Sequence, residues 1–505
     1  MSRVVIAGAG PVGLSLALGL ARYGIESTLI ERKRELDPHS RAIVLWPRTL
    51  EILAQWGVLD AFVGAAPKHT ALAAYAAETG ARLVSLDLGC IEDQTETAFA
   101  LFLPQDRTEQ LLLAAVRATG LAEVVFESEV VACADRGDYV ETSARRSDGS
   151  TVTYESAFLV GADGARGFVR SSLGYELEGK TYPLRTLLAD IVIDDERDQL
   201  PFPRISVMTR NLTGAVRYAE HTWRVVALFA HDEVADDGAP ERLLPERIEQ
   251  LFGAGPVKIL WTSLFRTHAR RASHFAAGRI ALAGDAAHLN SPAGGQGMNA
   301  GIADAHNLAW KLARALGGGD TALLLESYDI ERRDAIAGDV ERFTDALTRV
   351  AMLPTAMRLA AASALDLALT KAGRARGAAR RLGMLDIPYR RSTLFDTLAE
   401  RVGHRAPDLV VDGERLYARM GLDALLLAYH APGGLPIDEN ELRATLTGIP
   451  GVRLLVVDGD HGIAESWRAS RSFVALIRPD HYVGLLLRSW TPESLRAGVR
   501  RALGA

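Results

Sequence analysis

A glycine-rich turn near the N-terminus constrains the fold more than any other feature of the sequence. Gly8, Gly10 and Gly13 follow a short apolar run, 3–7, and open an apolar stretch of helical period, 11–23. Between a strand and a helix, such glycines permit a tight turn and let a pyrophosphate approach the backbone. The third glycine lets the helix pack closely on the strand. The chain is therefore expected to begin as a βαβ unit that binds a dinucleotide.

An acidic residue at the end of the next predicted strand supports this expectation. Glu31 closes the run 27–31, where its carboxylate would accept hydrogen bonds from both ribose hydroxyls of an adenosine. A glycine pattern alone also occurs in purely structural turns, but strand, helix and acid are all in place here. The pattern leaves FAD and NAD open. The residues assigned to this part of the cofactor site are Gly8, Gly10, Pro11, Val12, Gly13, Glu31 and Arg32.

A second motif, 284–299, places an acid at the end of a predicted strand and a glycine run at the start of a helix. Asp285 can bind a hydroxyl of a sugar chain, and the free amides of a helix N-terminus offer donors and a positive dipole. A reduced flavin carries negative charge near N1 and the C2 oxygen, so such a terminus favours its reduction. The motif therefore favours FAD. The assigned residues are Asp285, Gly295, Gly297, Met298 and Asn299.

Composition and charge limit the classes of protein to consider. The chain has 505 residues, more than the roughly 250–300 that one hydrophobic core serves, so several domains are expected. A net charge of −6 provides no basic field for nucleic acid. Cys90 and Cys133 lie far apart with no Cys/His cluster, so no disulfide framework and no metal site are expected. Without a signal peptide or a membrane-spanning run, the protein is expected in the cytoplasm.

The pattern of apolar and polar residues changes along the chain. Short alternating runs such as 223–228 predict a mostly antiparallel sheet inserted in the chain, after which a strand at 279–285 and a helix at 297–316 resume the α/β pattern. The expected fold class is α/β, with four segments: the first part of an FAD-binding domain, 1–180; a substrate-binding β-sheet domain, 181–270; the second part of the FAD-binding domain with a helical region, 271–383; and a small C-terminal α/β domain, 384–505.

A third motif, 161–170, completes a set that resembles the group A flavoprotein monooxygenases, the aromatic hydroxylases that share a fold with p-hydroxybenzoate hydroxylase. The resemblance covers residues 1 to about 345. It implies a Rossmann-like FAD-binding domain with an inserted β substrate domain. The tail is similar to the thioredoxin-like domain of larger members, but it contains no CxxC pair. The further cofactor contacts that the resemblance implies are those of Arg41, Gln105, Val130 and Asp163.

The resemblance also implies an activity, hydroxylation of a phenolic or polycyclic aromatic substrate with NADPH or NADH and O2, through a flavin C4a-hydroperoxide, in a monomer or homodimer. No catalytic side chain stands out, because the cofactor performs the bond-making. The pocket candidates are Arg217, Tyr218 and Pro292. The alternatives are another flavin reaction on the same scaffold, such as epoxidation, halogenation or reduction, or a flavin-binding protein without catalysis. The halogenase signature Trp-x-Trp-x-Ile-Pro is absent.

Overall fold

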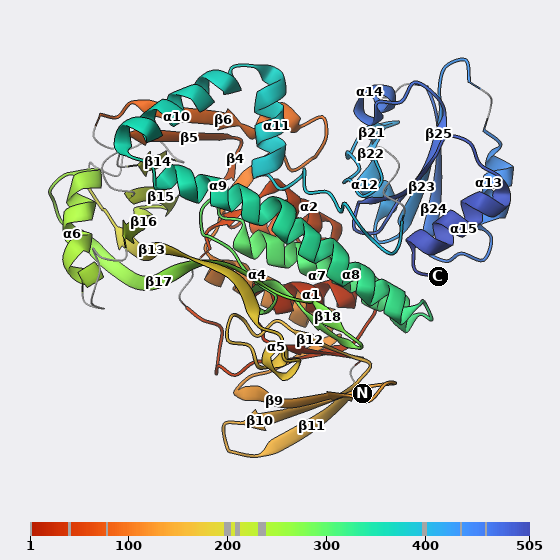
Figure 1. Cartoon of the computed structure of the whole chain (residues 1–505), viewed down its shortest axis with the longest axis horizontal. Coiled ribbons are helices and arrows are strands. Elements are labelled where there is room, and N and C mark those ends of the chain that lie inside the picture. Colours follow the sequence, from red (N-terminus) through yellow and green to blue (C-terminus); the bar gives the residue numbers. More distant parts are fainter. Residues whose placement is uncertain are drawn as a thin grey trace.

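The computed structural model describes residues 3–38, 42–76, 79–195, 204–207, 213–230, 239–395, 401–434, 437–459 and 462–505. A six-stranded sheet forms the centre of the N-terminal part (Figure 1). β1 pairs in parallel with both β2 and β12, as the glycine turn and its crossover helix require. Across the sheet the strands are β18 (Ala276–Ala277), β19 (Ile280–Leu282), β12 (Phe158–Gly161), β1 (Val4–Ala7), β2 (Ser27–Ile30) and β8 (Ala122–Val125).

Two helices that begin at glycine motifs pack against each other beside this sheet. α1 (Pro11–Arg22) starts at the first motif and α7 (Gly297–Leu316) at the second. They approach closely because Gly19 has no side chain: a Cβ there would lie 3.0 Å from the Cβ of Ala309. Both cofactor motifs are thus fixed to one core. The other helices of this part are α2 (Pro47–Gln55), α3 (Leu59–Val63), α4 (Gln105–Thr119) and α5 (Phe168–Ser172).

Two small sheets complete the N-terminal part. An antiparallel sheet of β9 (Ser128–Asp135), β10 (Val140–Arg146) and β11 (Thr151–Ser156) lies at the bottom of Figure 1. The other sheet orders β3 (Val44–Leu45), β7 (Ala100–Phe102) and β4 (Lys68–His69).

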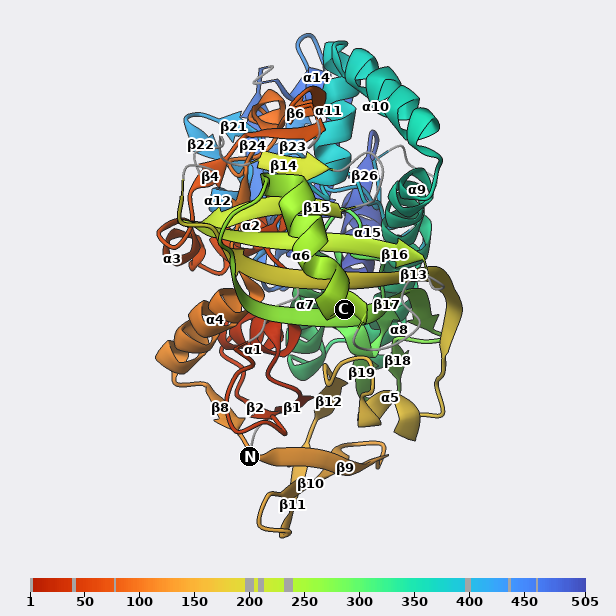
Figure 2. The same cartoon turned by 90° about the vertical axis from the view of Figure 1, so that its left-hand side faces the viewer.

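An eight-stranded sheet faces the reader in Figure 2, with α6 (Ala239–Phe252) lying across it. Its order is β20 (His288–Leu289), β17 (Lys258–Ala272), β13 (Leu177–Val192), β16 (Thr222–Ala230), β15 (Thr213–Ala219), β14 (Arg204–Val207), β5 (Ala71–Ala76) and β6 (Arg82–Asp87). Every pair of neighbours is antiparallel except β14 and β5, so the predicted, mostly antiparallel sheet is present.

The strand period of two divides this sheet into a core face and an open face. On β16, Trp223 and Val225 are fully buried in a separate apolar cluster with residues of α6. Their neighbours Arg224, Val226 and Leu228 line a large cavity on the opposite face. One strand therefore supports the fold with one set of side chains and the site with the other.

The sheet extends beyond the segment 181–270 that the sequence suggested for it. β5 and β6 come from the first segment of the chain, and β20 from the third. β5 joins the sheet because it runs parallel to β14, and β6 follows it as an antiparallel neighbour. Such long-range pairing leaves no local signal in the sequence. The domain limits themselves remain our proposal.

A helical layer covers the α7 side of the N-terminal part and continues over β6. Its helices are α8 (Thr321–Ala335), α9 (Glu341–Ala351), α10 (Thr355–Leu369) and α11 (Ala372–Leu382). α10 lies beside β6, where Asp366 accepts a hydrogen bond from the Ser85 amide at 3.1 Å (Figure 1). None of the helices in the described ranges is long and apolar enough to span a bilayer.

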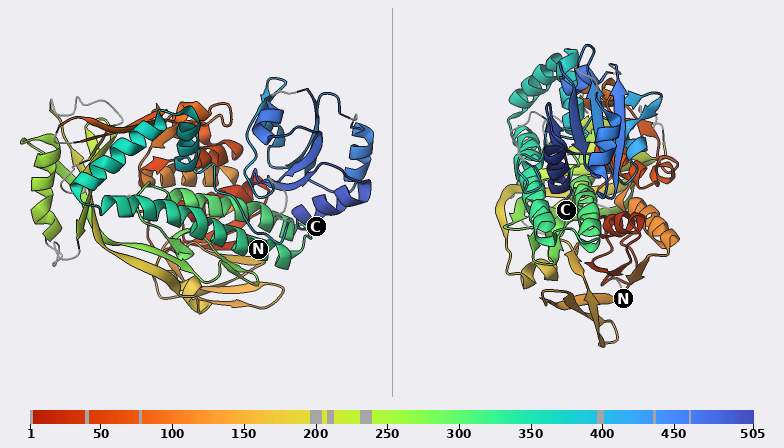
Figure 3. Two further views of the ribbon diagram at one scale, coloured as in Figure 1. Left: turned by 45° about the horizontal axis from the view of Figure 1, so that its top comes forward. Right: turned by 90° about the vertical axis from the view of Figure 1, so that its right-hand side faces the viewer.

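The C-terminal part is a separate layer at one end of the molecule (Figure 3). β23 runs parallel to β24, and β25 pairs antiparallel with β23 and β26. This βαβ unit followed by a ββα unit is the thioredoxin-like arrangement expected from the sequence. The elements are β21 (Val410–Val411), β22 (Glu414–Arg415), α12 (Leu416–Met420), β23 (Ala424–His430), α13 (Glu439–Leu446), β24 (Val452–Asp458), α14 (Ile463–Trp467), β25 (Phe473–Ile477), β26 (Val483–Leu487) and α15 (Pro492–Ala502).

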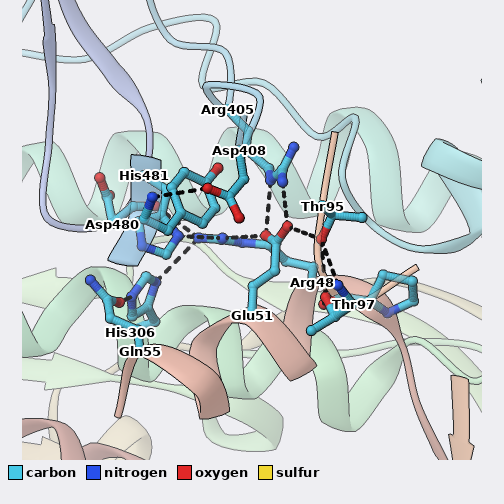
Figure 4. A network of polar contacts seen from close by, with 12 residues as sticks. Arg48, Glu51, Gln55, Thr95, Thr97, His306, Arg405, Asp408, Asp480 and His481 are labelled. Carbon is cyan, nitrogen blue, oxygen red and sulfur yellow. Dashed lines mark hydrogen bonds and ion pairs between the residues drawn. The ribbon is translucent and has the colours of Figure 1, made fainter. Parts of the chain in front are cut away.

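Buried charges join the C-terminal part to α2 (Figure 4). The Glu51 carboxylate accepts hydrogen bonds from Arg405 Nε at 2.9 Å, from Arg48 Nη1 at 2.9 Å and from Thr95 Oγ1 at 2.6 Å. Burial alone would raise the pKa of Glu51, but Arg405 and Arg48 hold it below its usual value. Arg48 also donates to the carbonyl of Asp480 at 2.8 Å. The two parts are therefore held by ion pairs removed from water.

We predict that Glu51→Gln destabilises the protein by about 3–5 kcal/mol, because it leaves two buried guanidinium groups without their counter-charge. Equilibrium urea unfolding measures this change. The matched control is Glu439→Gln, which removes the partner of Arg443 in an exposed pair and should cost no more than about 1 kcal/mol. Equal effects of the two substitutions would show that the buried pair adds nothing to domain docking.

Candidate functional site

A cavity of about 1490 Å³ lies between the two large sheets. Its walls come from the glycine turn before α1, the end of β2, the start of α4, the 284–298 segment and the open face of the eight-stranded sheet. The cavity also reaches residues of α9, α10 and α11. The two glycine motifs and the predicted substrate sheet thus share one continuous space.

The glycine turn has the conformation that the sequence predicts. Gly8 has φ +102°, and a Cβ there would lie 2.4 Å from the carbonyl oxygen of Ala162. A Cβ at Gly13 would lie 2.0 Å from the Gly8 oxygen. A Cβ at Gly10, by contrast, would meet nothing within 4 Å, and this residue lines the cavity together with Pro11 and Val12. The turn therefore leaves room for a phosphate against backbone amides at the N-terminus of α1.

Glu31 directly follows β2 and lies on the same wall, with Arg32 beside it. Its Oε2 accepts a hydrogen bond from the Ala9 amide at 2.9 Å, and its Oε1 accepts one from the Lys33 amide at 3.0 Å. The carboxylate is thus fixed next to the turn, where it can receive the hydroxyls of a ribose. Arg32 is exposed on the wall.

The start of α4 forms the next part of the wall. The backbone nitrogen of Gln105 donates a hydrogen bond to the Ala42 carbonyl at 2.9 Å, and its side-chain Nε2 donates one to Glu109 Oε1 at 2.8 Å. Val130, on β9, is buried and lines the cavity. Arg41, which the resemblance implies as a contact of the flavin's phosphate and ribityl region, lies outside the described residues. Glu109 was not singled out from the sequence, where it reads as an ordinary polar position of an amphipathic helix.

Asp163 belongs to the third motif and lies at the edge of the cavity before α5. Its Oδ2 accepts a hydrogen bond from the Val169 amide at 3.1 Å. Its Oδ1 is buried and has no hydrogen-bond partner within the described structure. Burial raises the pKa of this carboxyl above its usual value. A buried oxygen without a partner is costly, so its place on the cavity wall is consistent with a ligand contact.

Asp285 reaches the cavity from a loop that a buried carboxylate holds in place. Asp285 itself is exposed on the wall. The preceding amide, of Gly284, donates to Asp304 Oδ2 at 3.0 Å. The same carboxylate contacts His288 Nε2 at 2.7 Å and accepts from Arg332 Nε at 2.7 Å. His288, close to the flavin motif, is therefore engaged in supporting the loop.

The N-terminus of α7 faces the cavity at Gly297 and Met298. A Cβ at Gly297 would meet nothing within 4 Å, which leaves room for a planar ring against the first helical amides. Gly295 has φ +62°, and its Cβ would lie 2.4 Å from a methyl of Val44. Glycine is thus needed at this close approach.

Asn299 contributes through its side chain to the scaffold behind the cavity. It is only 1% exposed, and its Oδ1 accepts from the Trp46 amide at 2.9 Å and from Thr49 Oγ1 at 2.7 Å. Its Nδ2 donates to the carbonyls of Val44 and Gly295, both at 2.9 Å. The side chain that the sequence assigned to the cofactor is thus fully used in the scaffold, and in the described structure Asn299 does not line the cavity as Gly297 and Met298 do.

The structure places Val216 and Arg224 on the substrate side of the cavity, whereas Arg217 and Tyr218 do not line it within the described residues. Arg217 Nε donates to the Ala219 carbonyl at 3.4 Å. Arg224 is buried and pairs through two nitrogens with both Asp190 oxygens, each at 2.7 Å. Pro292 lies on the wall, as expected. The described residues contain no group of three or more side chains suited to hold a metal ion.

Comparisons with known proteins agree with this geometry. A family model described as an FAD binding domain matches residues 1–344. Over 511 residues the chain is 31% identical to a flavin-dependent monooxygenase of Mycobacteroides abscessus, with 96% of this chain and 97% of that protein covered. The chain belongs to the family of FAD-dependent monooxygenases. The present chain is also 37% identical over 353 residues to an uncharacterized aromatic compound monooxygenase of Bacillus subtilis, and the match covers 68% of each chain.

Solved structures show the same fold for the whole monooxygenase. An anhydrotetracycline hydroxylase from Streptomyces rimosus is 29% identical, with a TM-score of 0.78 and 99% of both chains covered. A ternary complex of aklavinone-11 hydroxylase with FAD and aklavinone has a TM-score of 0.84 at 25% identity, covering 100% of this chain and 99% of that one. The family and fold class predicted from the sequence are thus confirmed, including the C-terminal layer.

We predict that Glu31→Ala weakens FAD binding roughly tenfold to a hundredfold, because hydrogen bonds to a charged acceptor are worth ~1.5–3 kcal/mol. The rate at saturating FAD should change little, since this carboxylate is expected to bind the ribose and to take no part in the chemistry. Fluorescence titration of the apoprotein gives the affinity. Glu35→Ala, an exposed residue of the same wall, is the control. Unchanged affinity in Glu31→Ala would remove Glu31 from the cofactor site.

We predict that Asp285→Ala also lowers FAD affinity, while the reconstituted enzyme keeps the pH–rate profile of the parent. The carboxylate would hold the ribityl chain, so the group that titrates during catalysis would remain. FAD dissociation, melting temperature and the pH profile should be measured on one preparation. If the profile lost one limb while FAD stayed tightly bound, Asp285 would instead belong to the proton-transfer step.

Proposed function

We propose that the enzyme hydroxylates a phenolic, multi-ring aromatic substrate, with NADPH or NADH as reductant and O2 as oxidant. One observation supports the proposal. A single cavity of about 1490 Å³ joins the wall formed by the glycine turn, Glu31 and the N-terminus of α7 to the open face of the eight-stranded sheet. Pockets for one small molecule usually measure about 300–1,000 Å³, so this space fits a cofactor together with a substrate.

The substrate side of the cavity is mostly apolar. Aliphatic and aromatic side chains reach it from three strands of the sheet and from α9, and the residues are Leu188, Val226, Leu228, Leu264, Phe265, Phe343 and Leu347. Such a surface favours burial of flat, apolar rings. The anhydrotetracycline hydroxylase that resembles this chain is named for a multi-ring substrate, which supports the same class here.

The cofactor side of the cavity fits FAD through its open glycines and through an acidic residue at each end. Gly10 leaves room for phosphate, and Gly297 leaves room for the ring. Glu31 would hold the ribose and Asp285 the ribityl chain. FAD supplies the redox chemistry that transfers an oxygen atom from O2.

The protein's own part in the reaction is positioning and exclusion of water. The N-terminal amides of α7 would bind the carbonyl edge of the flavin and stabilise negative charge there. The 292–297 loop would flank the reacting carbon of the substrate, with Pro292 on the cavity wall. The apolar side chains of the sheet would hold the ring in one orientation and keep bulk water away from the reacting atoms.

The expected result of a substrate screen is NAD(P)H oxidation that accelerates when a phenolic polycyclic compound is added, with a product heavier by one oxygen atom. Absorbance of the nicotinamide and product mass measure the two events, and parallel assays with NADH and NADPH define the reductant. Single-ring phenols provide the size control. FAD-bound protein whose NAD(P)H oxidation no aromatic compound accelerates would contradict the proposal and favour a flavin-binding role without catalysis.

A further inference from the structure

A buried acid on the cofactor wall has no role in the site described above. Glu109 lies one turn after Gln105 on α4, is 4% exposed, and lines the cavity. Its Oε1 accepts the hydrogen bond from Gln105 Nε2 at 2.8 Å. The described residues provide no donor to its second oxygen. A buried carboxyl that accepts so few hydrogen bonds loses much of its solvation free energy when it is ionised.

Among the described residues, the charges around Glu109 compensate its negative charge only weakly. Burial raises its pKa to about 7, while Gln105 and Lys33 act in the opposite direction. Lys33, after β2, is itself paired with Asp37 at 2.5 Å, so its charge is already balanced. Asp37 and Asp106, the latter on α4, add negative charge and raise the pKa of Glu109 further.

In the proposed binding mode, the phosphates of FAD, its most negatively charged part, would lie along the same wall. Glu31, fixed to the glycine turn by the Ala9 amide, and Lys33 both come from the end of β2. An FAD molecule on this wall brings two phosphate charges and displaces water from Glu109. Both changes disfavour a carboxylate and favour a neutral carboxyl.

We propose that FAD binding is coupled to uptake of one proton by Glu109, which then faces the cofactor as a neutral hydrogen-bond donor. The proton comes from solvent and is released again when FAD leaves. A neutral carboxyl has one O–H donor, which can be given to an acceptor oxygen of FAD, while its other oxygen keeps the bond from Gln105. Glu109 is thus a binding residue for the cofactor, with no part in oxygen transfer.

The sign of the pH effect follows from this coupling. Well below pH 7 the carboxyl of the apoprotein already carries its proton, so FAD binds almost without proton uptake. Above pH 7 the proton must be taken from an increasingly basic solvent, and the FAD dissociation constant rises. Between pH 7 and pH 8.5 the rise should be roughly fifteenfold.

Titration calorimetry of the apoprotein with FAD at pH 7.5, in buffers of different ionisation enthalpy, measures the protons taken up. We expect about three quarters of a proton for the unchanged protein, from the ionised fraction of a group with a pKa near 7. Glu109→Gln, which imitates the neutral acid, should take up almost none and should bind FAD with little dependence on pH.

The matched control is Glu129→Gln. Glu129 also lines the cavity, but it is exposed and pairs with Arg145 at 3.2 Å, so its substitution should leave proton uptake unchanged. Absence of net uptake in the unchanged protein would overturn the proposal, even if Glu109→Gln failed to fold. Uptake that persisted in a folded Glu109→Gln would overturn it as well. Neither result would affect the assignment of the enzyme as an FAD-dependent monooxygenase.

Discussion

The cofactor side of the site depends on one buried carboxylate, that of Asp304. It accepts hydrogen bonds from the Gly284 amide and from Arg332, and it contacts His288. Burial alone would raise its pKa, but His288 and Arg332 hold the pKa below the usual value. Since Asp304 projects from α7, the helix whose N-terminus we propose for the flavin also fixes the loop that carries Asp285. One side chain thereby positions both of these proposed contacts with the cofactor.

The C-terminal layer reaches the same region through a second set of buried charges. Arg478, in the turn after β25, donates to both oxygens of Glu331 on α8, at 2.7 and 2.8 Å. Arg332, the next residue of α8, contacts the hydroxyl of Tyr389 at 3.4 Å and also binds Asp304. α8 is thus held between the flavin loop on one side and the C-terminal layer on the other. These contacts tie the C-terminal layer, which lacks a CxxC pair, to the helix that also binds Asp304.

Short sequence motifs predicted much of the cavity wall, because the geometry of each motif depends on residues that are close together in the sequence. The turn at Gly8, the acid at Glu31 and the helix start at Gly297 each depend on a few neighbouring residues, and the structure places all three on the cavity. The function of Asn299 was less accessible, because the loop it binds lies about 250 positions earlier in the chain. The same holds for the pairing of β5 with β14 and of Arg224 with Asp190. A buried Glu109 gives no sequence signal, since only the fold shows which helix face meets the cavity.

Substitutions on the two faces of β16 have different consequences, one for folding and the other for the shape of the cavity. Substitutions at Trp223 or Val225 would disturb the packing under α6 and would be judged by whether the protein folds. Substitutions at Val226 or Leu228 alter the cavity surface and leave that packing in place. A lineage can therefore exchange the cavity-facing residues one at a time and sample new aromatic compounds without losing the scaffold. Divergence of substrates among enzymes with this sheet requires no change of architecture.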